Sequence, residues 1–458
     1  MIVRNKSVLD SIGADVIQSV IKEHCAGDER RQSLIDMYNN DHAIRNRARM
    51  KGQPNNRMAH GFARYIVTFA SGYLLGKPVT YTAKEGQDEA PLEALMEAYC
   101  IAKVESVDSE LAHDASVLGK GVEIIYADED SRPRTANLDP CSAFVVYDDT
   151  VEHNPLFGVH YMPVIDRNGE NKGYTVNVYT AAEIITFETA STIASAAAFT
   201  LTGIAPHFFG GVPMVEYWNN AEETGDFEQV TTLIDAYDKL ESDRVNDKEQ
   251  FVDAILVLTG ARLETDENGR TPSQQLRQDK LLFLPDSDAT AQYLARNMAE
   301  ADVEVLKNAL KADIHKFSMI PDLTDEKFAG NSSGVAMKFK LLGLDQLTKI
   351  KERWFREALE ERLKLFSHFL SVKGAAAVDA GKVDIVFSRA LPVNDLEISQ
   401  TIMNYNGFVP EETLLAQVPF VTDPQSAAKA MQKQRADAAK AQAAAFNVPV
   451  YNPDGDDA

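Results

Sequence analysis

Residues 335–372 form the longest periodic segment of the chain and read VAMKFKLLGLDQLTKIKERWFREALEERLKLFSHFLSV. Apolar residues recur in it every three or four positions, which is the spacing of one face of an α-helix. The segment contains no proline, and as a single helix it would be roughly 55 Å long at about 1.5 Å per residue. Helices of globular proteins average about 11–12 residues, so this length favours an elongated or assembled protein.

Two further helices are predicted upstream, at residues 228–251 and 299–317. Their apolar residues also step by three or four positions, at Val230, Leu233, Ile234, Tyr237, Leu240 and Val245, and then at Val303, Leu306, Leu310, Ile314 and Phe317. Pro321 ends the second helix. Between them lie two apolar runs of strand length, 254–258 and 281–284, so the sequence predicts two helices that flank a small β-rich insert.

The N-terminal half mixes helices with short strands. Helical periodicity covers residues 15–38, 59–75 and 91–119, and strand-like runs occupy 79–82, 121–126, 144–147, 157–163, 174–179 and 213–218. Because short strands follow one another across turns, we predict an α+β fold with a mostly antiparallel sheet. A last strand at 382–388 precedes short helices around 396–405, 411–416 and 424–445, and the polar tail 447–458 is expected to be mobile.

Composition limits the class of protein. The 458 residues suggest roughly two to four domains. A net charge of -23 argues against a sequence-specific nucleic-acid binder, although an acidic surface would let DNA pass without being held. The three cysteines are far apart and outside any CxxC motif, which fits a reducing intracellular compartment. The sequence shows neither a signal-peptide pattern nor an apolar run of about 18 residues, so no membrane span is expected.

Residues 41–57 form a basic, Asn-rich segment in this acidic chain. It carries Arg45, Arg47, Arg49, Lys51 and Arg57. Three interpretations are open: a solvated loop, an electrostatic contact with an acidic neighbouring subunit, or a contact with DNA.

Three catalytic motifs are missing from the sequence: GxxxxGK[ST], HExxH and GxGxxG do not occur. Asp148 and Asp149 are adjacent, which suits a turn better than a two-metal site. His153 has only His160 nearby, and neighbouring helical residues such as His113 and Asp114 are not expected to face each other. We therefore predict no enzyme activity, catalytic residue, metal or cofactor. A phosphoryl- or nucleotidyl-transfer enzyme that uses Asp148 or His153 is the alternative.

Several local strings occur in a characteristic order. They are NNRM (55–58), FARYIV (62–67), GYLLGKPV (72–79), GVPMVEYWNN (211–220), DFE (226–228) and LIDAYD (233–238), followed by Ser242-Asp243 and the strand-like AIL (254–256). Together they resemble the portal proteins of tailed bacteriophages, of the siphophage type that infects mainly Gram-positive bacteria. The resemblance covers about residues 39–369.

The resemblance implies a portal-like division of the α+β subunit. Residues 1–227 would form most of the wing, and residues 228–253 and 298–320 the two stem helices. Residues 254–297 would form a small β-rich clip and 321–334 the tunnel loop. Residues 335–391 would supply the very long wing helix and a closing strand, and 392–458 a helical crown with a mobile acidic tail.

The same resemblance implies a non-enzymatic conduit in the virion. Such proteins form a homo-oligomeric ring, usually a dodecamer, at one vertex of the head, and double-stranded DNA passes through it without sequence recognition during packaging and ejection. Implied partners are the terminase large subunit, the head–tail adaptor, and the major capsid and scaffolding proteins, with assembly in the host cytoplasm and no membrane. A minor head protein without a closed channel is the alternative within this class.

The resemblance places a tunnel loop at the narrowest point of the channel. Gly330 and Gly334 favour a mobile segment. The residues expected to face DNA are Lys327, Phe328, Asn331, Ser332, Ser333, Lys338 and Lys340. The lysines would either touch phosphates transiently or form the solvated start of the long helix.

Overall fold

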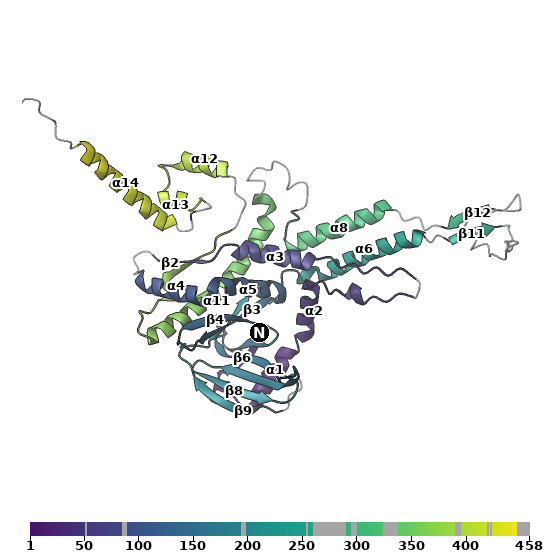
Figure 1. Ribbon diagram of the computed structural model, residues 1–458, viewed down its shortest axis with the longest axis horizontal. Coiled ribbons are helices and arrows are strands. Elements are labelled where there is room, and N and C mark those ends of the chain that lie inside the picture. Colours follow the sequence, from purple (N-terminus) through teal and green to yellow (C-terminus); the bar gives the residue numbers. More distant parts are fainter. Residues whose placement is uncertain are drawn as a thin grey trace, which may run out of the picture.

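The structure is a computed structural model that describes residues 1–50, 53–84, 89–193, 198–252, 255–259, 290–294, 300–323, 338–389, 395–418, 421 and 424–446. It is an α+β protein, as predicted, with a mixed body from which a pair of helices projects (Figure 1). Its principal helices are α1 (Ala14–Cys25), α2 (Asp28–Tyr38), α3 (Phe62–Leu75), α4 (Ala90–Ala102), α5 (Val104–Leu118), α6 (Thr231–Val252), α8 (Glu300–Ser318), α11 (Leu342–Val372), α12 (Asp395–Tyr405), α13 (Glu411–Leu415) and α14 (Pro424–Phe446).

The strands form sheets that are almost entirely antiparallel. They are β1 (Ile2–Arg4), β2 (Thr80–Ala83), β3 (Lys120–Ala127), β4 (Pro133–Leu138), β5 (Ala143–Asp148), β6 (Pro155–Ile165), β7 (Asn171–Tyr179), β8 (Glu183–Thr189), β9 (Thr200–Pro206), β10 (Met214–Trp218), β11 (Ile255–Thr259), β12 (Thr290–Leu294) and β13 (Val383–Val386). The orders are β1-β5-β6-β7-β8-β9, β10-β3-β4, β13-β2 and β11-β12. The β1–β5 pair is parallel and every other pair is antiparallel, which confirms the predicted sheet type.

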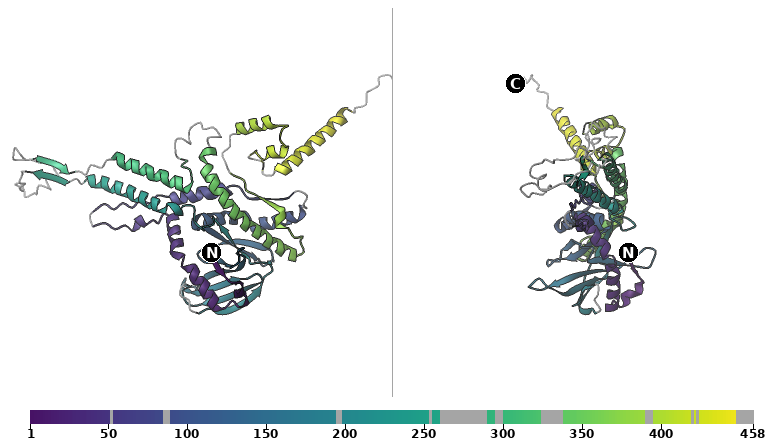
Figure 2. Two further views of the ribbon diagram at one scale, coloured as in Figure 1. Left: turned by 180° about the vertical axis from the view of Figure 1, so that it is seen from behind. Right: turned by 90° about the vertical axis from the view of Figure 1, so that its right-hand side faces the viewer.

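The two predicted upstream helices are present as α6 and α8. They lie side by side and project away from the sheets, with β11 and β12 at their far end (Figures 1 and 2). In the small sheet, β11 pairs with β12, with Ile255 opposite Leu294. The first predicted strand is therefore confirmed and its partner is a strand that the periodicity missed, whereas the predicted run 281–284 lies outside the described residues.

The long helix α11 has 31 residues, Leu342–Val372, and is about 46 Å long at about 1.5 Å per residue. The prediction of one unbroken helix from residue 335 is wrong at its start. Residues 338–340 are helical, but a turn at Leu341 separates them from α11, and residues 335–337 lie outside the described residues. Leu341 at the turn and Leu344 in the first turn of α11 are both buried, and Gly343 between them has low helix propensity, which favours a break of the helix at this point.

Hydrophobic side chains bury in four clusters, of which two involve α11. One cluster joins α11 to α4, α5, β3 and β10. A second cluster joins the starts of α6 and α11 to α3 and to the end of α8, through Ile234, Ile314 and Leu344 among others. The base of the projecting helix pair thus shares a core with the first turn of the long helix.

The C-terminal helices α12, α13 and α14 confirm the short helices predicted there. Their described side chains bury little apolar surface, and Leu414 and Ala428 are the core members that they supply. Two ion pairs, Lys429–Glu89 at 3.4 Å and Arg435–Glu411 at 2.6 Å, connect α14 to the rest of the chain. Within the described residues, no helix is both long and apolar enough to cross a membrane.

Candidate functional site: the base of the paired helices

Most of the predicted DNA-facing residues lie outside the described part of the chain, namely Lys327, Phe328, Asn331, Ser332 and Ser333. The other two, Lys338 and Lys340, lie in the short helical stretch before α11, and Lys338 is exposed. The structure therefore brings none of these seven residues together in a site that can be described, and their role stays a prediction.

The residues on either side of the range 324–337 are held by contacts with the body and with α8. Tyr65 on α3 donates its hydroxyl proton to the carbonyl of Pro321 at 2.8 Å and accepts from the backbone N–H of Leu323 at 3.3 Å. Lys311 on α8 pairs with Asp322 at 2.6 Å. Ile320 and Leu341 bury in the same cluster. Both described flanks of residues 324–337 are thus anchored at the base of the helix pair.

A buried polar stripe runs along α6 at this base. Its members, Asp238, Ser242 and Asn246, are four residues apart, which places them in one line on a helix, and all three are fully buried. They accept hydrogen bonds from the backbone N–H groups of His60 at 2.9 Å, Met58 at 2.9 Å and Asn56 at 2.7 Å. The side chains of α6 therefore satisfy an extended segment that has no strand partner of its own.

Asp238 is the most highly bonded member of the stripe. Besides the His60 backbone it contacts two imidazoles, the ring Nδ1 of His60 at 2.7 Å and the ring Nδ1 of His42. Burial raises the pKa of Asp238, but hydrogen bonds from His42 and His60 outweigh it, so the pKa lies below its usual value. Burial lowers the pKa of His42, but the hydrogen bond to Asp238 and its negative charge outweigh burial, and the pKa of His42 lies above its usual value. The pair thus favours a carboxylate and an imidazolium.

The basic segment 41–57 contacts its own helix pair. Arg47 pairs with Asp243 on α6 at 2.7 Å, and Arg49 pairs with the same carboxylate. The solvated-loop interpretation is therefore wrong for these two arginines, because both guanidinium groups pair with Asp243 of the same chain. A contact of the segment with a neighbouring subunit or with DNA stays a prediction. Arg45 and Arg57 remain exposed, and Lys51 lies outside the described residues.

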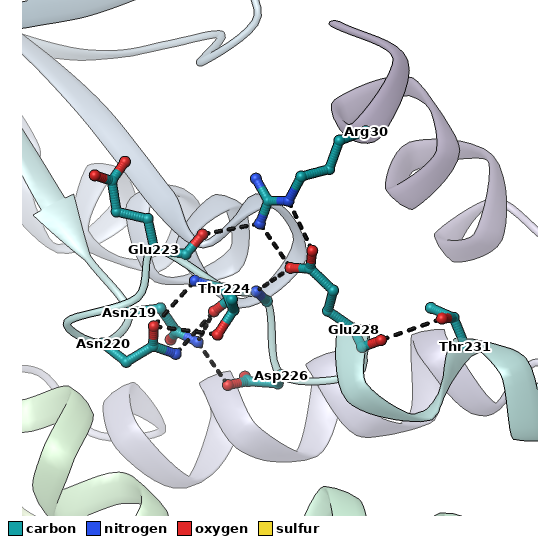
Figure 3. A network of polar contacts seen from close by, with 9 residues as sticks. Arg30, Asn219, Asn220, Glu223, Thr224, Asp226, Glu228 and Thr231 are labelled. Atoms are coloured by element: carbon teal, nitrogen blue, oxygen red, sulfur yellow. Dashed lines mark hydrogen bonds and ion pairs between the residues drawn. The ribbon is translucent and has the colours of Figure 1, made fainter. Parts of the chain in front are cut away.

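A second polar network joins α2 to the start of α6 (Figure 3). The guanidinium of Arg30 bonds both oxygens of Glu228 at 2.7 and 2.6 Å, and also the carbonyl of Glu223 at 2.8 Å. Nearby, Asn219 donates to Asp226 at 2.8 Å. A bidentate arginine fixes both distance and angle, so this network sets how α6 leaves the body.

The long helix enters the same junction through a buried lysine. Lys351 on α11 donates to Asp226 at 2.6 Å and to the hydroxyl of Ser116 on α5 at 2.7 Å. Lys351 and Asp226 have side chains that are 3% and 0% exposed. Removing either partner would leave a buried charge, so the pair locks α11 to the root of α6.

A second buried cation lies three turns further along α11. Arg362 is fully buried and pairs with Asp108 on α5 at 2.6 Å and Glu123 on β3 at 2.8 Å. Burial raises the pKa of Asp108 to about 6, although Arg362 acts in the opposite direction. Glu123 also accepts from the hydroxyl of Tyr217 at 2.7 Å. Together, the buried ion pairs of Lys351 and Arg362 fix both the rotation of α11 about its axis and its position along that axis.

Sequence reasoning missed both the polar stripe and the two buried cations. Each left a signal: polar residues four apart on α6, and Lys351 and Arg362 in register with the apolar face of α11. Fully buried charges are rare unless they are paired, so a cation on that face predicts a carboxylate partner. The sequence alone does not say which carboxylate.

The residues considered for catalysis have structural contacts. Asp148 accepts from the backbone N–H groups of Thr150 and Asn154 at 3.2 and 2.9 Å, which confirms the turn interpretation. The imidazole Nδ1 of His113 and a carboxylate oxygen of Asp114 lie 3.0 Å apart, so the expectation that these neighbours do not face each other is wrong. Within the described ranges, no group of three or more His, Cys, Asp or Glu side chains is placed to hold a metal ion.

An α+β body that carries a projecting helix pair and is tied together by buried ion pairs has the construction of a structural subunit. The comparison with known families agrees: the chain belongs to the family "Phage portal protein, SPP1 Gp6-like", whose profile matches residues 18–441. This family is a structural component of phages and not an enzyme, so the phosphoryl-transfer alternative is wrong.

Two relatives carry the name portal protein. The one from Bacillus phage SPP1 is 23% identical over 385 residues, which cover 81% of this chain and 74% of the relative. The one from Clostridium phage phiCD119 is 28% identical over 230 residues, which cover 49% of this chain and 48% of the relative. Both come from phages of Gram-positive bacteria.

Proposed function

We propose that this chain is the subunit of a ring at one vertex of a phage head, through which double-stranded DNA passes during packaging and ejection. Membership of the portal family supports this function. The observation that carries it is the shared base of α6, α8 and α11, where Ile314, Ile320 and Leu341 are buried together. A segment anchored at both ends beside a projecting helix pair is suited to line a channel when copies are arranged around an axis.

The parts of the subunit follow from this proposal. We assign α6 and α8, within residues 228–253 and 298–320, to the stem, residues 254–297 to the clip and residues 321–334 to the tunnel loop. Residues 1–227 and 335–391 form the wing, and residues 392–458 the crown. The stem assignment is supported by ion pairs between its helices, including Arg244–Glu304 at 3.0 Å and Lys248–Glu300 at 3.2 Å.

The charge of the chain suits a passage for DNA. Tight binding to DNA comes from many lysine and arginine contacts that release counterions, and such contacts would hold the polymer in place. With 46 basic and 69 acidic residues, this chain carries an excess of negative charge. Exposed Lys338, beside the proposed tunnel loop, would touch passing phosphates only briefly.

The proposal also assigns partners. The clip, at the far end of the stem, docks the terminase large subunit during packaging and later the head–tail adaptor. The wing contacts major capsid and scaffolding proteins, and the assembled ring, expected to be a dodecamer, is part of the virion. ATP hydrolysis is left to the terminase.

Negative-stain imaging with mass determination on the purified protein tests the ring. We expect rings with a central hole and a mass of about a dozen subunits. A monomer or dimer at micromolar concentration would contradict the ring, and a minor head protein would then be the better assignment.

A deletion tests the tunnel loop. Removing residues 328–333 should leave rings intact, because the anchoring contacts of Tyr65 and Lys311 lie outside the deletion, but should impair DNA packaging or retention. Removing the six tail residues 453–458 is the matched control and should package normally. Normal DNA-filled particles from the 328–333 deletion would overturn the tunnel-loop assignment.

A further inference from the structure

A cavity of about 410 Å³ lies between the end of β10, the β5–β6 turn and α11. Its lining residues are Met1, Tyr147, Glu152, His153, Pro155, Met214, Val215, Glu216, Trp218, Trp354, Glu357, Ala358 and Glu361. The volume lies within the range of about 300–1,000 Å³ that is usual for small-molecule sites. Nothing in the conduit function uses this cavity.

Aromatic rings form one wall. Trp218, at the end of β10, and Trp354, on α11, have ring centroids 5.3 Å apart and planes inclined by 38°. Tyr147 meets Trp218 edge-on at 5.9 Å. The chain contains two tryptophans, and both line this cavity. Indole faces carry negative electrostatic potential and attract organic cations.

Carboxylates form the rim. Trp354, Glu357, Ala358 and Glu361 follow at intervals of three, one and three residues, so they share one face of α11. Glu152 approaches from the β5–β6 turn. Glu361 pairs with Lys364, whereas Glu357 forms no ion pair among the described residues. Met1, whose ammonium group pairs with Glu223 at 2.6 Å, also lines the cavity, so the three carboxylates leave a net negative charge beside the aromatic wall.

The buried carboxylate at the floor does not add to this charge. Glu216 accepts from Lys120 at 2.9 Å, from the indole N–H of Trp218 at 3.0 Å and from the hydroxyl of Tyr147 at 3.2 Å. The burial of Glu216 disfavours its charge, but Lys120 and these donors hold its pKa below the usual value. The carboxylate of Glu216 is thus fully engaged by donors of the protein and holds the rings of Trp218 and Tyr147 in place. The carboxylates at the rim are left to bind a ligand.

These features distinguish between kinds of cation. A metal ion would need three or more ligating side chains close together, and the described residues offer no such group here. An aliphatic chain gains from contact with the indole rings, and its ammonium groups gain both from the ring faces and from Glu152, Glu357 and Glu361. We propose that the cavity binds an aliphatic diamine or polyamine.

Intrinsic tryptophan fluorescence reports on this site directly, because both tryptophans line it. We expect spermidine, titrated into the purified full-length protein, to produce a saturable change in tryptophan emission, with putrescine binding more weakly. The double variant Glu357→Gln/Glu361→Gln should bind spermidine about tenfold more weakly, since two negative charges are removed from the rim of the cavity. Glu360→Gln, an exposed change on the same helix that does not line the cavity, is the matched control and should bind normally.

Three outcomes would overturn the proposal. An equal emission change with Mg²⁺ at the same concentration would show unspecific counterion binding. Equal spermidine affinity in the double variant would show that the amine binds elsewhere. Tighter binding of an arginine analogue with blocked ends would instead assign the cavity to a protein side chain. Because Glu357 is exposed and Glu361 pairs only with the exposed Lys364 among the described residues, the double variant is expected to fold, and circular dichroism checks this.

Discussion

The buried polar stripe on α6 leads to a prediction that can be tested through the hydrogen exchange of individual backbone amides. Asp238→Asn keeps the shape of the side chain but removes its charge and replaces one acceptor oxygen by a donor. In the native protein the carboxylate accepts from the backbone of His60 and contacts the rings of His42 and His60. An amide at this position turns an N–H group toward one of these partners. Residues 42–60 should therefore loosen from α6.

The cost can be worked from the buried contacts. Hydrogen bonds to charged groups contribute about 1.5–3 kcal/mol, and breaking a buried charge pair by altering one partner costs about 3–5 kcal/mol. Asparagine retains one acceptor, so we expect about 3 kcal/mol of local destabilisation. Since about 1.4 kcal/mol is a factor of ten, the amides of Met58 and His60 should exchange about a hundredfold faster.

Hydrogen–deuterium exchange with mass spectrometry measures this effect. Peptides covering residues 53–60 should lose protection in Asp238→Asn, whereas the six-stranded sheet should not change. Asp247→Asn, the same substitution at a partly exposed position of α6, is the control and should leave the exchange of residues 53–60 unchanged. Native protection of His60 in Asp238→Asn would refute the reasoning that the carboxylate holds this segment.

The same contact predicts a pH window for the stability of this segment. Because the pKa of Asp238 is lowered by folding, its contribution is present above about pH 4 and is lost as the pH falls through the folded pKa. Because the pKa of His42 is raised by folding, its contribution is full below about pH 6.5 and is lost as the pH rises through the folded pKa. Protection of residues 53–60 should thus be greater at pH 5.5 than at pH 8.5 after correction for intrinsic exchange, and a flat profile would contradict this. Arg362→Met should destabilise the body by about 3–5 kcal/mol in thermal or chemical unfolding, because two carboxylates stay buried without a cation. Neutralising both carboxylate partners in the same variant should recover part of the loss, exposed Lys364→Met is the control, and equal unfolding of Arg362→Met and native protein would show that the triad is not a structural anchor.

The sequence by itself determined the elements that repeat with a regular period. The apolar spacing in residues 228–251, 299–317 and 335–372 predicted α6, α8 and most of α11, because side chains three or four apart share a helix face whatever that face later contacts. The strand-like runs of the N-terminal half predicted an antiparallel sheet because short strands follow one another across turns, although β1, β4, β8 and β9 were missed. The order of the local strings was also enough to indicate the portal family. The role of the seven tunnel-loop residues remains a prediction.

Only the tertiary structure decided which residues the faces of these helices and strands contact. Asp238 contacts residues nearly 200 positions earlier, Lys351 reaches Asp226, and Trp354 reaches Trp218. Periodicity fixes which residues share a side of one element, but the partner across a buried interface depends on how separate elements pack. For that reason the basic segment 41–57 was open to three interpretations from sequence, and the carboxylate of Asp243, carried on another element, settled the position of its two inner arginines.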